Sequence, residues 1–141
     1  MVELALVAPV LFVIALAAFD GGMYVYSFIA VQDAARAAAL RNSGGRESAA
    51  DQPGACSVAT DHLRGLPSIS ATAGVCASSP LVVSSILCDG QNACGSANAS
   101  ADGSLATLVT VSYTPPSLFR IPLAGPLTVR AVSEMKLRST E

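Results

Sequence analysis

Four cysteines, Cys56, Cys76, Cys88 and Cys94, carry the best-defined chemistry in this 141-residue chain. Their spacings are not CxxC, and His62 is the only histidine, so the pattern does not resemble a zinc site. An even number of cysteines in one small region is typical of disulfides formed in an oxidising compartment. Of the three possible pairings, the sequential one, Cys56 with Cys76 and Cys88 with Cys94, closes the two shortest loops, and we prefer it while the other two stay open.

Two carboxylates, Glu3 and Asp20, lie within the most apolar stretch of the chain, at its N-terminus. A charge in an apolar bundle is tolerated only when it is paired. Glu3 could pair with the free amine of Met1 on a neighbouring copy and so fix the register of packed helices. Asp20 is a weaker candidate, which could pair with Arg36 or Arg41 of another copy or lie at a membrane interface.

The same stretch contains residues that weaken a helix. Pro9 cannot donate a backbone hydrogen bond and should kink the helix or open it locally. Gly21 and Gly22 form a second soft point. We expect breaks at these positions to let a long helix bend as it packs.

Composition excludes several classes of function. Charged residues make up 13% of the chain, against about 25% in ordinary soluble domains. With a formal net charge of -2 and no run of Lys or Arg, no nucleic-acid partner is expected. The chain lacks a phosphate-binding glycine loop, a metal-ligand cluster and a nucleophile elbow, and its carboxylates Asp89, Asp102 and Glu134 are scattered. We therefore expect no enzyme, no cofactor and no metal, and we assign His62 no chemistry.

Residues 1–31 could form a signal peptide, a membrane anchor or the core helix of a polymer. A cleaved signal peptide is disfavoured, because an acid rather than Lys or Arg precedes the apolar run. A plain transmembrane anchor is possible, but residues 4–19 span only roughly 24 Å of a hydrocarbon core of about 30 Å, so it needs residues beyond Asp20. Tyr24 and Tyr26 could then lie at the outer interface. The third is a helix that lies in the membrane before assembly and in the packed core of a polymer afterwards.

The helix should continue through the alanine-rich sequence QDAARAAALR and stop at residues 42–45, NSGG. It would then hold about 40 residues and measure roughly 60 Å. We divide the chain into a membrane and filament-core helix, residues 1–43, and an extracellular αβ head, residues 44–141.

The head should contain one short helix and three to four antiparallel strands, which gives an α+β fold. We expect the helix over Ala55 to Leu66, and strands over Ile69 to Cys76, Leu105 to Thr114 and Leu127 to Arg138. Leu81 to Cys88 could be a strand or a helical turn. In the last strand, Leu127, Val129, Ala131, Met135 and Leu137 should face inward. The apolar connection from Pro115 to Pro126 should cover the sheet or contact a neighbouring copy.

Two separated blocks carry a family resemblance. VELALVAP, with the following apolar run, the acid at Asp20 and QDAARAAALR, resembles the N-terminus of TadE-like pilins. LVTVSYTPPSLFRIPLAGPLTVRAVSEMKLR resembles the closing strands of that family. The resemblance implies a subunit or minor component of tight-adherence (type IVc) pili, which works with a prepilin peptidase and a pilus assembly machinery. Such proteins generally carry the acid at the fifth mature position, whereas Glu3 is third, so the processing site stays open.

The leading hypothesis is a structural subunit that is anchored in the cytoplasmic membrane and then polymerises into an extracellular filament, as a major or a minor pilin. The alternative is a monomeric, membrane-tethered extracellular module for binding or adhesion. That module would hold its ligand with the connection from Pro115 to Pro126 or with the loop between Cys88 and Cys94.

Overall fold

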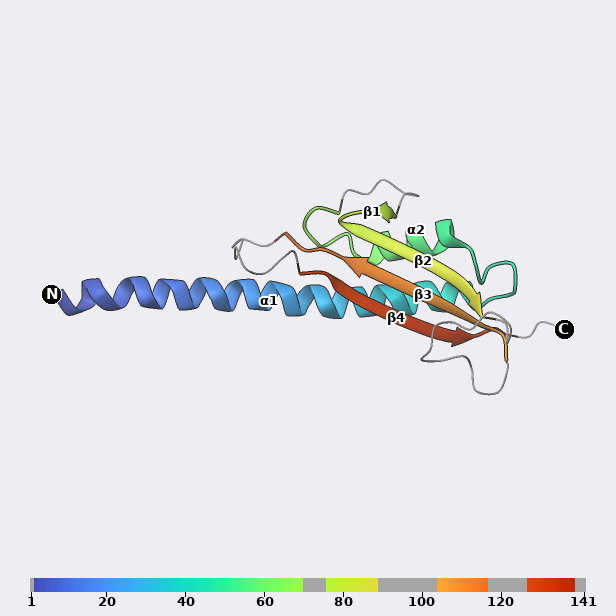
Figure 1. Ribbon diagram of the computed structural model, residues 1–141, viewed down its shortest axis with the longest axis horizontal. Helices are drawn as coiled ribbons and strands as arrows, with labels where there is room; N and C mark the ends of the chain where they lie inside the picture. Colours follow the sequence, from blue (N-terminus) through green and yellow to red (C-terminus); the bar gives the residue numbers. More distant parts are fainter. Residues whose placement is uncertain (1, 70–75, 89–103, 117–126, 139–141) are drawn as a thin grey trace.

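One helix extends far beyond a small mixed head in the computed structural model, which describes residues 2–69, 76–88, 104–116 and 127–138, with side chains from Val7 onward (Figure 1). The elements, in chain order, are α1 (Val2–Asn42), α2 (Gln52–His62), β1 (Ala77–Ser78), β2 (Leu81–Cys88), β3 (Ala106–Tyr113) and β4 (Val129–Lys136). The predicted α+β fold, with its long apolar N-terminal helix, is confirmed.

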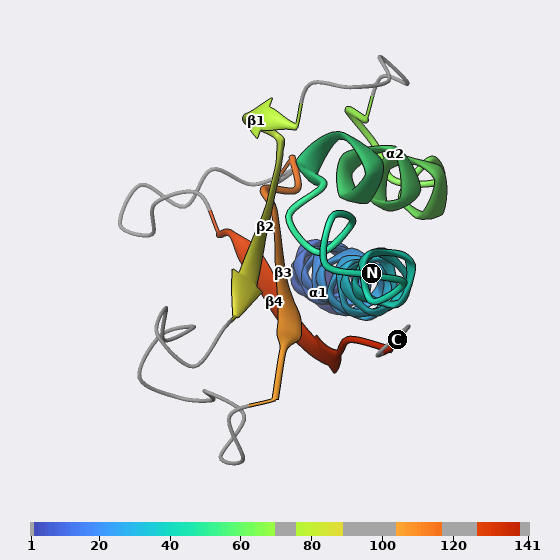
Figure 2. The ribbon, with the colours of Figure 1, turned by 90° about the vertical axis from the view of Figure 1, so that its right-hand side faces the viewer.

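The four strands form an antiparallel sheet in the order β1-β2-β3-β4. Because successive side chains alternate between faces, each long strand presents one apolar face to the helices. The residues of that face are buried: Val83, Val109, Val111, Tyr113 and Val129. Viewed along α1, both helices lie on this same side of the sheet (Figure 2).

The C-terminal half of α1 packs on the sheet through alanines. Ala34, Ala35, Ala38 and Ala39 are at most 1% exposed, and together with Val31 they belong to the main core. Small side chains let the helix axis approach the strands closely, and alanine also favours the helix. The alanine-rich continuation of the apolar run therefore docks α1 onto the head.

The second helix begins three residues earlier and ends four residues earlier than predicted, at Gln52 and His62. The Asp51 carboxylate caps it by accepting a hydrogen bond from the backbone N–H of Gly54 at 3.0 Å. Pro53, in the first turn, has no backbone N–H to leave unpaired there. At the other end the chain leaves the helix before Gly65.

The disulfide between Cys56 and Cys76 joins α2 to the segment before β1 and confirms the preferred pairing for these two residues. Cys88 is also disulfide-bonded. The predicted bridge from Cys88 to Cys94 involves a residue outside the described part of the chain, so that pairing stays a prediction.

The strand predictions differ from the structure mainly at their ends. The ambiguous segment Leu81 to Cys88 is a strand, and the strand predicted from Leu105 is β3, one residue shorter at each end. The last strand starts at Val129, and Leu127, expected to face inward, is 59% exposed because it precedes the sheet. Residues 70–75 and 117–126 lie outside the described chain, so most of the predicted strand from Ile69 and of the apolar connection is untested.

Tyr113 links the sheet to the end of the α2 region. Its side chain is fully buried, and its hydroxyl donates a hydrogen bond to the Pro67 carbonyl at 2.7 Å. Burial raises the pKa of the Tyr113 hydroxyl above its ordinary value. The group therefore remains a neutral donor at physiological pH and holds the chain after α2 against β3.

Candidate membrane and assembly interface

The N-terminal half of α1 projects from the head without contributing to its core. From Val7 to Tyr26 no residue is buried, and Ser27 is the first buried position among the helix residues whose side chains are described. Thirteen large apolar residues between positions 7 and 29 are exposed: Val7, Val10, Leu11, Phe12, Val13, Ile14, Phe19, Met23, Tyr24, Val25, Tyr26, Phe28 and Ile29. A helix that is apolar on every side needs a membrane or other helices around it.

The length of this projecting segment matches a bilayer. Twenty helical residues, 7–26, rise about 30 Å, which is the thickness of the hydrocarbon core. Tyr24 and Tyr26 lie at its head-proximal end, where aromatic residues favour the membrane interface. By length and composition α1 is able to cross a membrane, and its apolar N-terminal half suggests membrane anchoring.

Polar groups in the projecting segment and just after it differ in whether they have a partner. Ser27 donates its hydroxyl to the Met23 carbonyl at 2.8 Å, so that hydroxyl is satisfied inside the helix. Asp20, by contrast, is half-buried and forms no hydrogen bond or ion pair with any described residue. A carboxylate at this depth is costly in a membrane and needs a partner in an assembly.

The other predicted positions of this segment lie on the same helix. Glu3 is in the first turns of α1 and Met1 lies outside the described chain, so their pairing stays a prediction. The helix runs without interruption through Pro9, Gly21 and Gly22 in the single chain, and bending during packing also stays a prediction. A Cβ atom added at either glycine would meet nothing within 4 Å. No contact with the described residues therefore requires glycine there.

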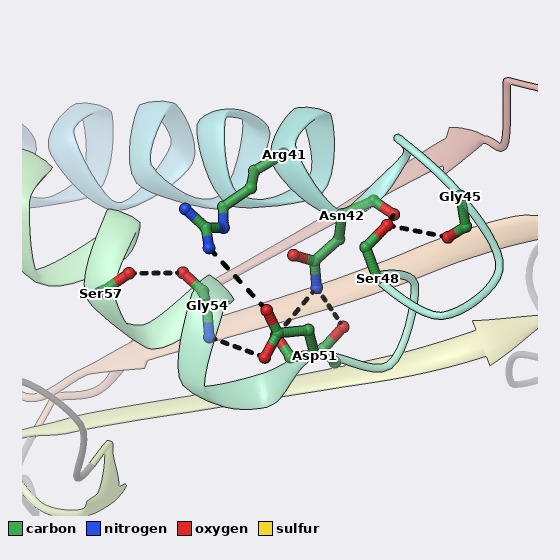
Figure 3. Close-up of polar contacts among 8 residues, drawn as sticks. Arg41, Asn42, Gly45, Ser48, Asp51, Gly54 and Ser57 are labelled. Atoms are coloured by element: carbon green, nitrogen blue, oxygen red, sulfur yellow. Dashed lines mark hydrogen bonds and ion pairs between the residues drawn. The ribbon is translucent and has the colours of Figure 1, made fainter.

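A buried asparagine fixes the point where α1 ends. The Asn42 amide, fully buried, donates to the Asp51 carbonyl at 3.1 Å and to the Ser85 hydroxyl at 2.8 Å (Figure 3). Ser85 and Thr107 in turn both donate to the Ala49 carbonyl, at 2.8 and 2.7 Å. These bonds hold the end of α1 and the following loop against β2 and β3. The sequence identified Asn42 only as a helix stop.

The neighbouring charges lie closer to the surface. Arg41 approaches the Asp51 carboxylate at 3.9 Å, and both side chains are partly exposed (Figure 3). A Cβ atom at Gly54 would collide with that carboxylate and come within 2.9 Å of the Arg41 Nε atom, which explains a glycine inside α2. Because Arg41 has this partner within its own chain, it is a weaker candidate than Arg36 for pairing with Asp20 of another copy.

We predict that Asn42→Ala lowers the free energy of unfolding of the head by about 2 kcal/mol, or roughly 10 °C in melting temperature. The substitution removes two hydrogen bonds that join α1 to the loop and to β2. Thermal unfolding followed by circular dichroism measures the effect. Ser84→Ala, next to Ser85 but on the other face of β2, is the matched control and should change the melting temperature little. Equal melting temperatures for Asn42→Ala and wild type would refute this role.

Groups suited to catalysis or metal binding do not come together in the described residues. Within them, no three His, Cys, Asp or Glu side chains are placed to hold a metal ion. His62 is exposed at the end of α2, next to an exposed ion pair of 2.6 Å between Asp61 and Arg64. The position of His62 supports no acid–base role.

Comparison with known proteins gives one match. The model of the TadE-like protein family matches residues 1–40, which are almost the whole of α1. Residues 1–40 of the chain are TadE-like. The predicted resemblance is confirmed over this helix, while the block that resembles the closing strands lies outside the match. Searches of curated proteins and of solved structures found no match. The TadE-like helix suggests a protein associated with the tight-adherence pilus.

Proposed function

We propose that this TadE-like chain is a structural subunit of an extracellular pilus-like filament and polymerises through α1 after membrane anchoring. The observation that supports this most is the projecting segment, in which twenty consecutive residues, 7–26, include no buried residue. Before assembly, the bilayer would cover this surface. In the filament, the helices of other copies would cover it.

Apolar burial alone does not drive the chain from the membrane into the filament. Lipid tails are as apolar as leucine side chains, so moving α1 from lipid to a helix bundle gains little hydrophobic free energy. Asp20 supplies a difference between the two states. An ionised Asp costs about 2.5 to 3.5 kcal/mol at the middle of a membrane helix and less towards its ends, where Asp20 lies, and pairing in a bundle removes part of that cost. In this proposal, Asp20, which lies within residues 7–26, favours assembly because it is unfavourable in lipid. Glu3, which precedes these residues, fixes the register through its pair with Met1.

We predict that Glu3→Ala reduces the amount of filament by at least about tenfold while the head remains folded, because one charge of the Glu3–Met1 pair is lost. The measurement is the yield of sheared filaments, with circular dichroism of the same preparation as a test of folding. Glu47→Ala, which removes an exposed carboxylate from the loop after α1, is the matched control. Normal filament yield from Glu3→Ala would refute the register role.

Electron microscopy of sheared cell-surface material, with an antibody against the head, tests the proposed function. Labelling along the filaments is expected for a main subunit, and labelling at the ends for a minor subunit. The alternative function, a monomeric membrane-tethered binding or adhesion module, predicts that the chain stays in the membrane fraction and that no filament is labelled. Labelled filaments would exclude that alternative.

A further inference from the structure

One solvent-facing stripe of α1, the arginine stripe, has a single arginine among less polar residues. It consists of Val25, Ile29, Gln32, Arg36 and Leu40, at spacings of four, three, four and four, which lie on one face of a helix. The three apolar members are each more than half exposed. The stripe therefore presents an apolar surface that the isolated chain leaves uncovered.

A second arginine, on the sheet, lies beside the arginine stripe. Gln32 and Arg36 of α1, with Arg130, Ala131 and Val132 of β4, line a groove of about 190 Å³. Among the described residues, no carboxylate lines the groove, and neither arginine forms a hydrogen bond or ion pair. Two guanidinium groups without a partner among the described residues, and an amide in the same groove, suit a carboxylate or another anion with several acceptor atoms.

The projecting segment carries the complementary pattern. A second stripe, the aspartate stripe, repeats the spacings of four, three, four and four: Pro9, Val13, Leu16, Asp20 and Tyr24. In this stripe the charged position is the carboxylate of Asp20, which has no partner among the described residues.

An offset of 16 residues superimposes the two stripes. Each of the five positions of the aspartate stripe then meets a position of the arginine stripe at the same height, and Asp20 meets Arg36. Pro9, Val13 and Tyr24 meet Val25, Ile29 and Leu40 in the same way. Apolar residues thus face apolar residues at three levels, and acid faces base at one.

We propose that the groove formed by Arg36 and Arg130 binds the Asp20 carboxylate of a second copy, displaced by about 24 Å along parallel helices. This inference rests on the proposed function and names the contact by which the filament would grow.

The geometry of a helix makes this contact open-ended. Sixteen residues at 3.6 per turn rotate the helix by roughly 160° beyond four full turns. Asp20 and Arg36 therefore point to nearly opposite sides of α1. The Asp20 carboxylate of each copy can bind the groove of one neighbour, while its own groove binds the Asp20 carboxylate of another. A heterologous contact that does not close into a ring generates a filament.

A lipid headgroup is a less suitable occupant. With Tyr26 at the edge of the hydrocarbon, Gln32 lies about 9 Å and Arg36 about 15 Å further along the helix. The headgroup layer extends only roughly 5 to 8 Å beyond the hydrocarbon. The groove thus lies beyond the lipid phosphates, at the height where a displaced neighbour presents its helix.

The test uses the full chain, purified in detergent and allowed to assemble as detergent is removed. Asp20→Arg and Arg36→Asp should each reduce the sedimenting, filamentous fraction at least about tenfold. Combining them restores opposite charges and should return assembly to within roughly threefold of wild type. Arg46→Asp, which makes the same charge change on an exposed loop arginine, should assemble like wild type.

Three results would overturn the inference, and they differ from one another. If both single variants assemble like wild type, the contact is wrong while the filament stands. If wild type itself forms no assemblies, the proposed function fails and this contact fails with it. If Arg36→Asp reduces binding to phosphatidylglycerol vesicles but leaves assembly unchanged, the groove binds lipid rather than a second copy.

Discussion

A chain that begins at Ser27 is expected to remain in solution as a folded head, whereas the full chain associates with membranes. The reason is that only the second half of α1 contributes to the core of the head. Every core residue among those described lies at position 31 or later, and residues 7–26 contribute none. Removing residues 1–26 should reduce the fraction that sediments with lipid vesicles by at least about a hundredfold. The melting temperature of the head should change by only a few degrees.

The full chain with Leu16→Arg provides a graded comparison. Leu16 lies near the middle of the projecting segment, and an arginine there costs about 3 kcal/mol on insertion scales, so membrane association should be intermediate. An unfolded product from the truncated chain would show that the head depends on residues 1–26. Sedimentation of the truncated chain with vesicles would show that the head itself binds lipid.

Loss of the disulfide between Cys56 and Cys76 should be the most destabilising change within the head. The bridge closes a loop with a sequence separation of 20, and loop-closure entropy for that length corresponds to about 3 kcal/mol. The double variant Cys56→Ser and Cys76→Ser should therefore lower the melting temperature by roughly 10 to 20 °C. Both cysteines are buried, so the two hydroxyls add a further cost.

Circular dichroism during heating measures this effect, and Ser78→Ala, at an exposed position of β1, is the matched control. A shift of only 1 or 2 °C in the double variant would mean that α2 is held by packing alone. In that case the contacts of Ala55, Ala59 and Leu63, all fully buried on α2 and its end, would carry its stability.

Periodicity predicted the elements whose pattern is unambiguous. The continuous apolar run followed by alanines predicted α1, and strict alternation predicted β3 and most of β4. The start of α2 was predicted too late, because Gln52, Pro53 and Gly54 have the composition of a loop. Asp51 as an N-cap and Pro53 in the first turn were the available sequence indications of the earlier start.

Contacts between distant segments could not be predicted from one sequence. Asn42 was identified as a helix stop, but its buried bond to Ser85 depends on how β2 pairs in the sheet. Arg130 joins Arg36 at the groove only because β4 packs beside α1, and no local pattern links the two residues. The exposure of the projecting segment likewise required knowing where the head begins to cover α1.

Helical reconstruction of the sheared filaments by electron cryomicroscopy tests most directly whether the chain polymerises through α1. We expect parallel α1 helices in the centre, with residues 7–26 enclosed by neighbouring copies, and heads on the outside. Neighbours related by a displacement of about 24 Å along the axis are expected among them. A filament joined through its heads, with α1 outside the core, or a chain found only in the membrane would contradict polymerisation through this helix.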